Sequence, residues 1–114
     1  MELKISDRVV DGVLVLDCSG RLVFGDESGM LRDKVKVLMT EGAKKIILNM
    51  RDVTYIDSGG LGTLVGLYSS AKAAGADIKL AQVASRVGQL LQVTKLLTVF
   101  DVKDSVEAAA ASFK

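Results

Sequence analysis

An aspartate and a serine stand just before two glycines in the stretch TYIDSGGLGTL, which runs from Thr54 to Leu64. Three roles compete for the hydroxyl of Ser58: a nucleophile, part of a phosphate cradle, or a surface group that another protein modifies. Because the stretch joins an apolar run to the start of a predicted helix, Asp57 or Ser58 is also expected to cap that helix. Capping by one of the two does not exclude a second role for the serine.

The nucleophile interpretation has little support. The chain contains no histidine, which excludes a Ser-His-Asp triad, a histidine-based zinc site and a phosphohistidine carrier. The stretch IDSGG lacks the glycine that precedes the serine by two residues in a hydrolase elbow, and the residue three positions after Ser58 is Leu61 rather than a lysine that could act as base. The single cysteine, Cys18, lies in the apolar run VLVLDC, which predicts a buried and inert thiol. We therefore expect neither serine hydrolysis at Ser58 nor a cofactor or metal site.

The glycines that follow do not form a nucleotide-binding loop. GGLG has too few spaced glycines for a dinucleotide fingerprint and lacks the G-K-[ST] ending of a Walker loop. A helix N-terminus can still hold a phosphate, which favours a covalent phosphate on Ser58. Gly59 and Gly60 would leave the hydroxyl open and let two backbones approach, whereas Gly62 and Gly66 are predicted to serve tight helix packing.

The elements that must position this motif are predicted from periodicity and turn signals. Two β-rich runs, LKISDRVV and GVLVLDCSG, flank the hairpin dipeptide Asp11-Gly12, and RLVF could add a third strand. A helix is predicted from about Glu27 to Glu41, with Met30, Leu31, Val35 and Leu38 at helical spacing and Gly42 as its C-cap. The apolar run KKIILNM predicts a central strand, and a second helix follows from Ser58 to Ala74, ended by Gly75.

The C-terminal third continues the alternation. ADIKLAQV predicts a strand, SRVGQLLQVT a helix with a serine cap, and LLTVFDV either a short edge strand or a loop. DSVEAAAASF predicts a last helix, which Asp104 and Glu107 could start as a capping box. The sequence therefore predicts one α/β domain over residues 1–114: an antiparallel hairpin, then strands alternating with helices.

The composition limits the classes of molecule that the chain is expected to bind. Fifteen basic and fourteen acidic residues among 114 leave a net charge of +1, and three Phe and two Tyr offer few stacking platforms. Nucleic acid and membrane surfaces are therefore not expected as partners. No apolar stretch approaches the length of a membrane span, and one cysteine suits a reducing compartment, so we expect a cytoplasmic protein.

Four passages resemble the STAS domain of bacterial anti-sigma factor antagonists, also called anti-anti-sigma factors. They are GRL at Gly20 to Leu22, IILNMRDVTYIDSGGLGTL from Ile46, GADIKL from Gly75 and VGQLLQVTKLLTVFDVKDSVEAA from Val87. The resemblance covers nearly the whole chain in order, and its most specific part is D-S-x-G-L after a strand. It implies a mixed sheet of four to five strands with about four helices packed mainly on one face, and no catalysis by the domain itself.

The resemblance also implies a function. Such an antagonist, when unphosphorylated, binds an anti-sigma factor that is often also a serine kinase, and so frees a sigma factor. The kinase phosphorylates the serine after the aspartate, here Ser58, and a phosphatase restores it. An alternative is a STAS scaffold or regulatory subunit of another assembly, either a stress-sensing complex or a lipid-transport ATPase, without a kinase switch. A weak homodimer also remains open.

The partner surface implied by the resemblance combines the serine motif with the loop that precedes the first helix. One position departs from the family: an acidic residue usually follows the G-x-L strand, and this chain has Val23 there. Either Asp26 substitutes for that acid or the kinase contact differs. The residues expected at the partner surface are Asp57, Ser58, Gly59, Gly60, Leu61, Phe24, Gly25, Asp26 and Glu27.

Overall fold

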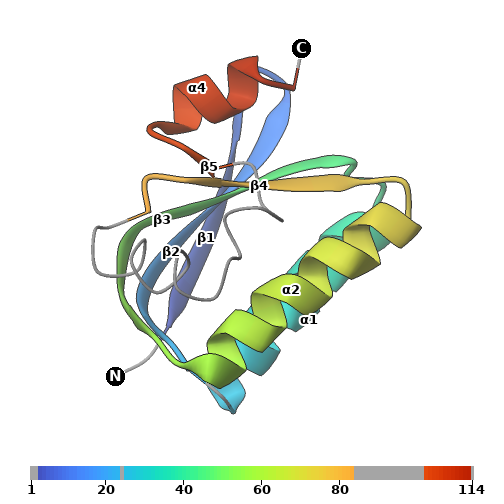
Figure 1. The fold of residues 1–114 in the computed structure, drawn as a ribbon. Coiled ribbons are helices and arrows are strands. Elements are labelled where there is room, and N and C mark those ends of the chain that lie inside the picture. The colour runs from blue at the N-terminus through green and yellow to red at the C-terminus, as the bar shows by residue number, and fades with distance from the viewer. Residues whose placement is uncertain (1–2, 24, 84–101, 114) are drawn as a thin grey trace.

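The computed structural model describes residues 3–23, 25–83 and 102–113. These residues form a five-stranded sheet and three helices (Figure 1). In chain order the elements are β1 (Lys4–Val10), β2 (Val13–Leu22), α1 (Asp26–Thr40), β3 (Lys45–Ile56), α2 (Ser58–Ala73), β4 (Asp77–Ala81), β5 (Val102–Lys103) and α4 (Val106–Ala111).

The sheet is mixed, as predicted. Its strand order is β1-β2-β3-β4-β5; β1 is antiparallel to β2, and every other neighbouring pair is parallel. The hairpin turns at Asp11 and Gly12, whose φ angles of 52° and 79° are those of a type I′ turn, so this prediction is confirmed. RLVF does not add a strand, because Arg21 and Leu22 are the last residues of β2.

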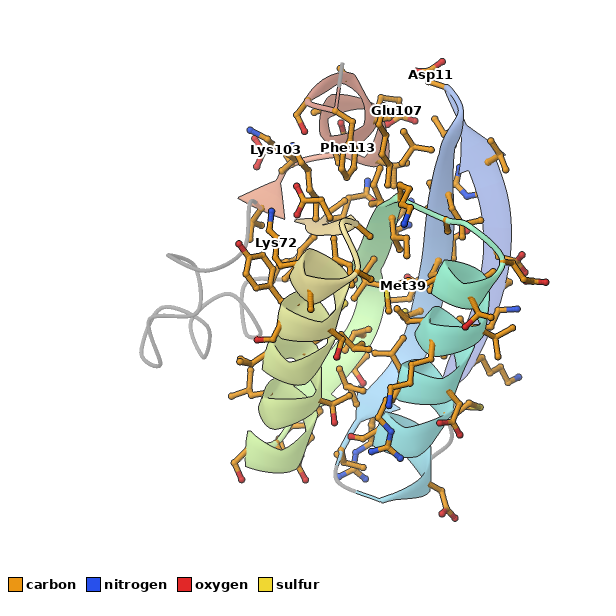
Figure 2. All side chains as sticks on the ribbon, turned by 90° about the vertical axis from the view of Figure 1, so that its right-hand side faces the viewer. Asp11, Met39, Lys72, Lys103, Glu107 and Phe113 are labelled. Carbon is orange, nitrogen blue, oxygen red and sulfur yellow. The ribbon has the colours of Figure 1, made fainter. Side chains whose placement is uncertain are left out.

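The two faces of the sheet carry separate apolar cores. Helices α1 and α2 lie side by side on one face, and the short α4 covers one end of the other face (Figures 1 and 2). Alternation along the strands supplies both cores. In β3, Ile46 and Leu48 point toward α1 and α2, whereas Ile47 joins Val13 and Val15 beneath α4.

The boundaries of α1 and α2 agree with the predictions to within one residue, whereas α4 is shorter at both ends than the predicted DSVEAAAASF. Past the ends of α1 and α2, Gly42 and Gly75 adopt φ angles of 101° and 75°, which glycine adopts without strain. The capping box predicted for the last helix is wrong. The N-cap of α4 is Ser105, whose hydroxyl accepts a hydrogen bond from the N–H of Ala108 at 3.0 Å. The helix predicted in SRVGQLLQVT lies outside the described residues, as does most of LLTVFDV, of which Val102 begins β5.

Candidate functional site

The two predicted site segments, the serine motif and the loop before α1, meet at the edge of the sheet formed by the C-terminal ends of β2 and β3. Strands β2 and β3 are parallel, and their last residues, Leu22 and Ile56, are partners in register. Helices α1 and α2 therefore both begin at this edge, at the lower end of the sheet in Figure 1. The backbone N–H of Asp57 donates to the carbonyl oxygen of Leu22 at 3.3 Å, which joins the start of α2 to the end of β2.

Asp57, rather than Ser58, caps α2. Its backbone is extended, and its Oδ1 accepts a hydrogen bond from the N–H of Gly60 at 2.7 Å. Ser58 is the first residue of the helix and is exposed. Among the described residues, no hydrogen bond holds the Ser58 hydroxyl. The cap therefore occupies the carboxylate and leaves the serine oxygen at the surface.

Gly60 is the position where the motif needs a glycine. A Cβ there would overlap the carbonyl oxygen of Leu22 and lie 2.9 Å from its carbonyl carbon. The backbone of α2 thus contacts the end of β2 directly, which confirms for Gly60 the predicted close approach of two backbones. The packing role predicted for Gly62 and Gly66 is wrong, because a Cβ at either would meet no atom within 4 Å.

Hydrogen bonds join the first turn of α1 to Val23 and Gly25. Gly25, with φ of 112°, stands at the N-cap position, and its carbonyl accepts from the N–H of Gly29 at 3.0 Å. Ser28 is buried, and both its N–H and its hydroxyl donate to the carbonyl of Val23, at 3.2 and 2.6 Å. Asp26 is exposed as the first residue of α1. Phe24 and the side chain of Glu27 lie outside the described residues.

The chemistry available at this edge is limited. Leu61 is half-buried against the α1–α2 core, Gly59 is half-buried, and no histidine exists in the chain to take a proton from Ser58. No group of three or more Cys, Asp or Glu side chains suited to a metal ion occurs in the described part of the chain. Burial raises the pKa of the Cys18 thiol to about 12, so that thiol stays protonated at neutral pH, as predicted. The arrangement suits a hydroxyl that is acted upon.

One pair of side chains beside this edge was not anticipated from the sequence. The guanidinium carbon of Arg21 lies 5.2 Å from the ring centre of Tyr55, and the two residues are partners in the β2–β3 register. They lie 34 positions apart along the chain. Only the strand register brings them together, and an irregularity in that register hides the pairing from simple alternation.

Comparisons with known proteins identify the class. The sequence profile of the STAS domain family matches residues 4–109, and the chain belongs to this family. The family assignment explains the mixed sheet with α1 and α2 on one face. Within the described ranges, no helix has the length and apolar character needed to cross a membrane.

The chain is similar to three known proteins that carry related names. Over 78 residues it is 35% identical to the anti-sigma-B factor antagonist of Bacillus subtilis, covering 68% of this chain and 71% of that one. A crystal structure from Thermotoga maritima, described as a candidate anti-sigma factor antagonist, shares 25% identity and a TM-score of 0.86, covering 95% and 92% of the two chains. The Bacillus cell fate determinant SpoIIAA in its phosphorylated form shares 18% identity and a TM-score of 0.73, covering 98% and 99%.

Proposed function

We propose that this chain is an anti-sigma factor antagonist controlled by phosphorylation of Ser58. Unphosphorylated, it binds an anti-sigma factor that is also a serine kinase, and a sigma factor is freed. Phosphorylation of Ser58 by that kinase ends the interaction, and a phosphatase restores it. The domain performs no catalysis of its own, and its place of action is the cytoplasm.

The observation that carries the proposal is the position of the Ser58 hydroxyl. It is exposed on the first residue of a 16-residue helix, beside a carboxylate that already caps the helix. A kinase needs an accessible hydroxyl, and a cap formed by Asp57 does not compete for it. The names of the relatives, together with the phosphorylated form of SpoIIAA, support the same interpretation.

Electrostatics explain how such a modification would act as a switch. A phosphate adds roughly −1.5 to −2 charge at pH 7. At the start of α2 it meets the positive end of the helix dipole, which stabilises the phosphorylated free protein. Inside an interface the same group lies near the Asp57 carboxylate and loses its water. Converting a nearly complete complex into a nearly dissociated one takes about 5.5 kcal/mol, and charge repulsion and desolvation both contribute to it.

The proposed partner surface spans both segments at this edge. It comprises Asp57, Ser58, Gly59, Gly60 and Leu61, together with the loop from Phe24 to Glu27. Val23 replaces the acid usual in the family, and we propose that the exposed Asp26, three residues later, supplies the negative charge for the kinase contact.

Incubation with the cognate anti-sigma kinase, ATP and Mg²⁺, followed by mass spectrometry, tests the switch. We expect one phosphate on Ser58 and none on a Ser58→Ala variant. Ser58→Glu should weaken binding of the anti-sigma factor in calorimetry, whereas Ser69→Glu, at an exposed position of the same helix, should bind as wild type does. A wild-type chain without phosphate on Ser58, or equal affinities for the two glutamate variants, would refute the switch.

The alternative is a STAS subunit of a stress-sensing complex or of a lipid-transport ATPase. Co-purification with other STAS proteins or with an ABC ATPase, in the absence of any kinase partner, would favour it.

A further inference from the structure

The pair formed by Arg21 and Tyr55 lies on the face of the sheet opposite α1 and α2, at the ends of β2 and β3 that precede α1 and Ser58. Their strand neighbours Leu22 and Ile56 are buried beneath α1 and α2, so Arg21 and Tyr55 fall on the opposite face. The described helix on that face, α4, packs over the other end of the strands, on Val13, Val15, Ile47 and Ala81. Tyr55 is 40% exposed.

A β-bulge places Tyr55 there. Gly20 pairs with Val53 and Arg21 with Tyr55, so Thr54 is an extra residue in β3. The bulge allows Val53 and Ile56 both to be buried in the α1–α2 core, with Tyr55 turned outward opposite Arg21. The hydroxyl of Thr54 donates to the carbonyl of Gly20 at 3.2 Å and satisfies part of the interrupted ladder.

The contact holds the arginine in place without neutralising it. A guanidinium 5.2 Å from an aromatic ring centre is attracted to the ring face and keeps its outward N–H groups as donors. In the described part of the chain Arg21 forms no ion pair, unlike Arg8, which binds Asp17. Arginine stacked on tyrosine offers a fixed fork of donors that matches a carboxylate.

Building on the proposed function, we propose that Arg21 and Tyr55 form a second contact for the anti-sigma factor and that they bind a carboxylate side chain of that partner. The two sites are continuous, because the carbonyl of Leu22, the residue after Arg21, accepts the Asp57 N–H and lies against Gly60. A partner seated over Ser58 can therefore extend across the sheet edge onto the pair. Tyrosine and arginine are also the residue types most often found to dominate protein interfaces.

Calorimetric titration with the purified cognate anti-sigma factor tests the pair. We expect Arg21→Glu to weaken binding by about tenfold or more, because like charges then face each other. Tyr55→Ala should weaken it, whereas Tyr55→Phe, which keeps the ring, should bind nearly as wild type does. Arg51→Glu is the matched control, since Arg51 is an exposed arginine earlier in the same strand, outside the pair. Circular dichroism melts verify that each variant is folded.

The salt dependence of the binding affinity, and the set of variants that lose affinity, distinguish the possible outcomes. The affinity of wild type should fall with rising salt more steeply than that of Arg21→Gln. Equal losses for Arg21→Glu and Arg51→Glu would overturn the second contact but leave the Ser58 switch intact. Wild type that does not bind the anti-sigma factor at all would overturn both proposals. A change in oligomeric state, rather than in partner affinity, would show that a second copy of the chain occupies the pair, and would also overturn the inference.

Discussion

From the sequence alone, either Asp57 or Ser58 could cap α2; in the structure Asp57 is the cap. The carboxylate of Asp57 accepts the N–H of Gly60 at 2.7 Å, and the hydroxyl of Ser58 stays exposed. An aspartate and a serine are equally good N-caps, so composition cannot decide between them. The deciding contact is the hydrogen bond from the Asp57 N–H to Leu22, which fixes where the extended chain ends and where α2 begins.

Two glycines of α2 should respond to alanine in opposite directions. Gly60→Ala forces a Cβ against the Leu22 carbonyl and is expected to lower the free energy of unfolding by about 1–3 kcal/mol, as overpacking does. Gly62→Ala adds a methyl group in open space and should raise it by up to roughly 1 kcal/mol, because alanine favours the helix. Urea unfolding monitored by circular dichroism measures both. Equal effects of the two substitutions would contradict the packing described for Gly60.

The glycines also show where prediction from the sequence fails. All four glycines of α2 carry the same propensity cost, and Gly62 and Gly66 have the spacing of a helix contact. The close approach nevertheless falls on Gly60, because the partner backbone is the end of β2. Helix spacing reveals which residues share a face, but the element that lies against that face depends on the tertiary fold.

Among the elements, α4 is attached by a buried lysine that sequence reasoning passed over. Lys79 of β4 is 7% exposed, and its Nζ donates to the carbonyl and hydroxyl oxygens of Ser112, at 3.1 and 2.7 Å. The same Nζ lies 4.5 Å from the ring centre of Phe113, which is labelled at the end of α4 in Figure 2. Lysine in a strand usually predicts a solvated position, so the run ADIKLAQV concealed this contact.

Removing the Lys79 amine should loosen α4. Lys79→Ala is expected to cost about 1–3 kcal/mol of stability and to speed amide hydrogen exchange over 106–111 more than over α1 and α2. Lys44→Ala is a matched control, because Lys44 also donates to a carbonyl at a helix end, that of Ala74 at 3.0 Å, but in an exposed place. Its cost should stay within roughly 0.5 kcal/mol. Uniform acceleration of exchange in Lys79→Ala would argue against a specific attachment of α4.

The boundaries of the first hairpin, α1 and α2 were largely predictable because their signals are local, whereas β3 continues past the predicted run KKIILNM to Ile56. The Asp11-Gly12 turn and the residues after α1 and α2 have positive φ, and the glycines at these positions indicate that conformation in the sequence. The start of α4 was misassigned by one residue, since Asp104 and Ser105 are both good caps. Met30 was expected on the apolar face of α1 but is 43% exposed, whereas Leu31 and Val35 are fully buried.

At the scale of the whole molecule, a polar cluster on the face of the sheet that carries α4 links three strands. Arg8 of β1 donates from Nε to Oδ2 of Asp17 at 2.7 Å, and Asn49 of β3 donates to Oδ1 of the same carboxylate at 2.7 Å. The hydrogen bond from Arg8 is the main cause that lowers the pKa of Asp17 below its ordinary value of 3.8. Asp17 lies in β2, so its charged form supports the pairing of β2 with both neighbours.

The stabilising effect of this cluster should disappear in acid. A carboxylate whose pKa is lower in the folded protein stabilises the fold above its ordinary pKa, and that stability is lost as the pH falls through the folded value. Wild type should therefore lose its advantage over Asp17→Asn as the pH is lowered from 7 to below about 4. Urea unfolding across this range measures the difference, with Asp33→Asn, whose carboxylate side chain is 76% exposed, as the control. A constant difference between wild type and Asp17→Asn at all pH values would refute the assignment.

The contact between Gly60 and the Leu22 carbonyl makes the serine motif conditional on tertiary structure. The cap bond from the Gly60 N–H to Asp57 lies within the stretch Thr54 to Leu64. The two contacts that hold the start of α2 in place do not, because the Asp57 N–H and Gly60 both meet the Leu22 carbonyl, on a strand that ends about 35 residues earlier. A protein that recognises the Ser58 surface therefore reads a conformational epitope. Such a protein would not bind newly made or unfolded chains. It would bind only molecules in which the sheet is assembled.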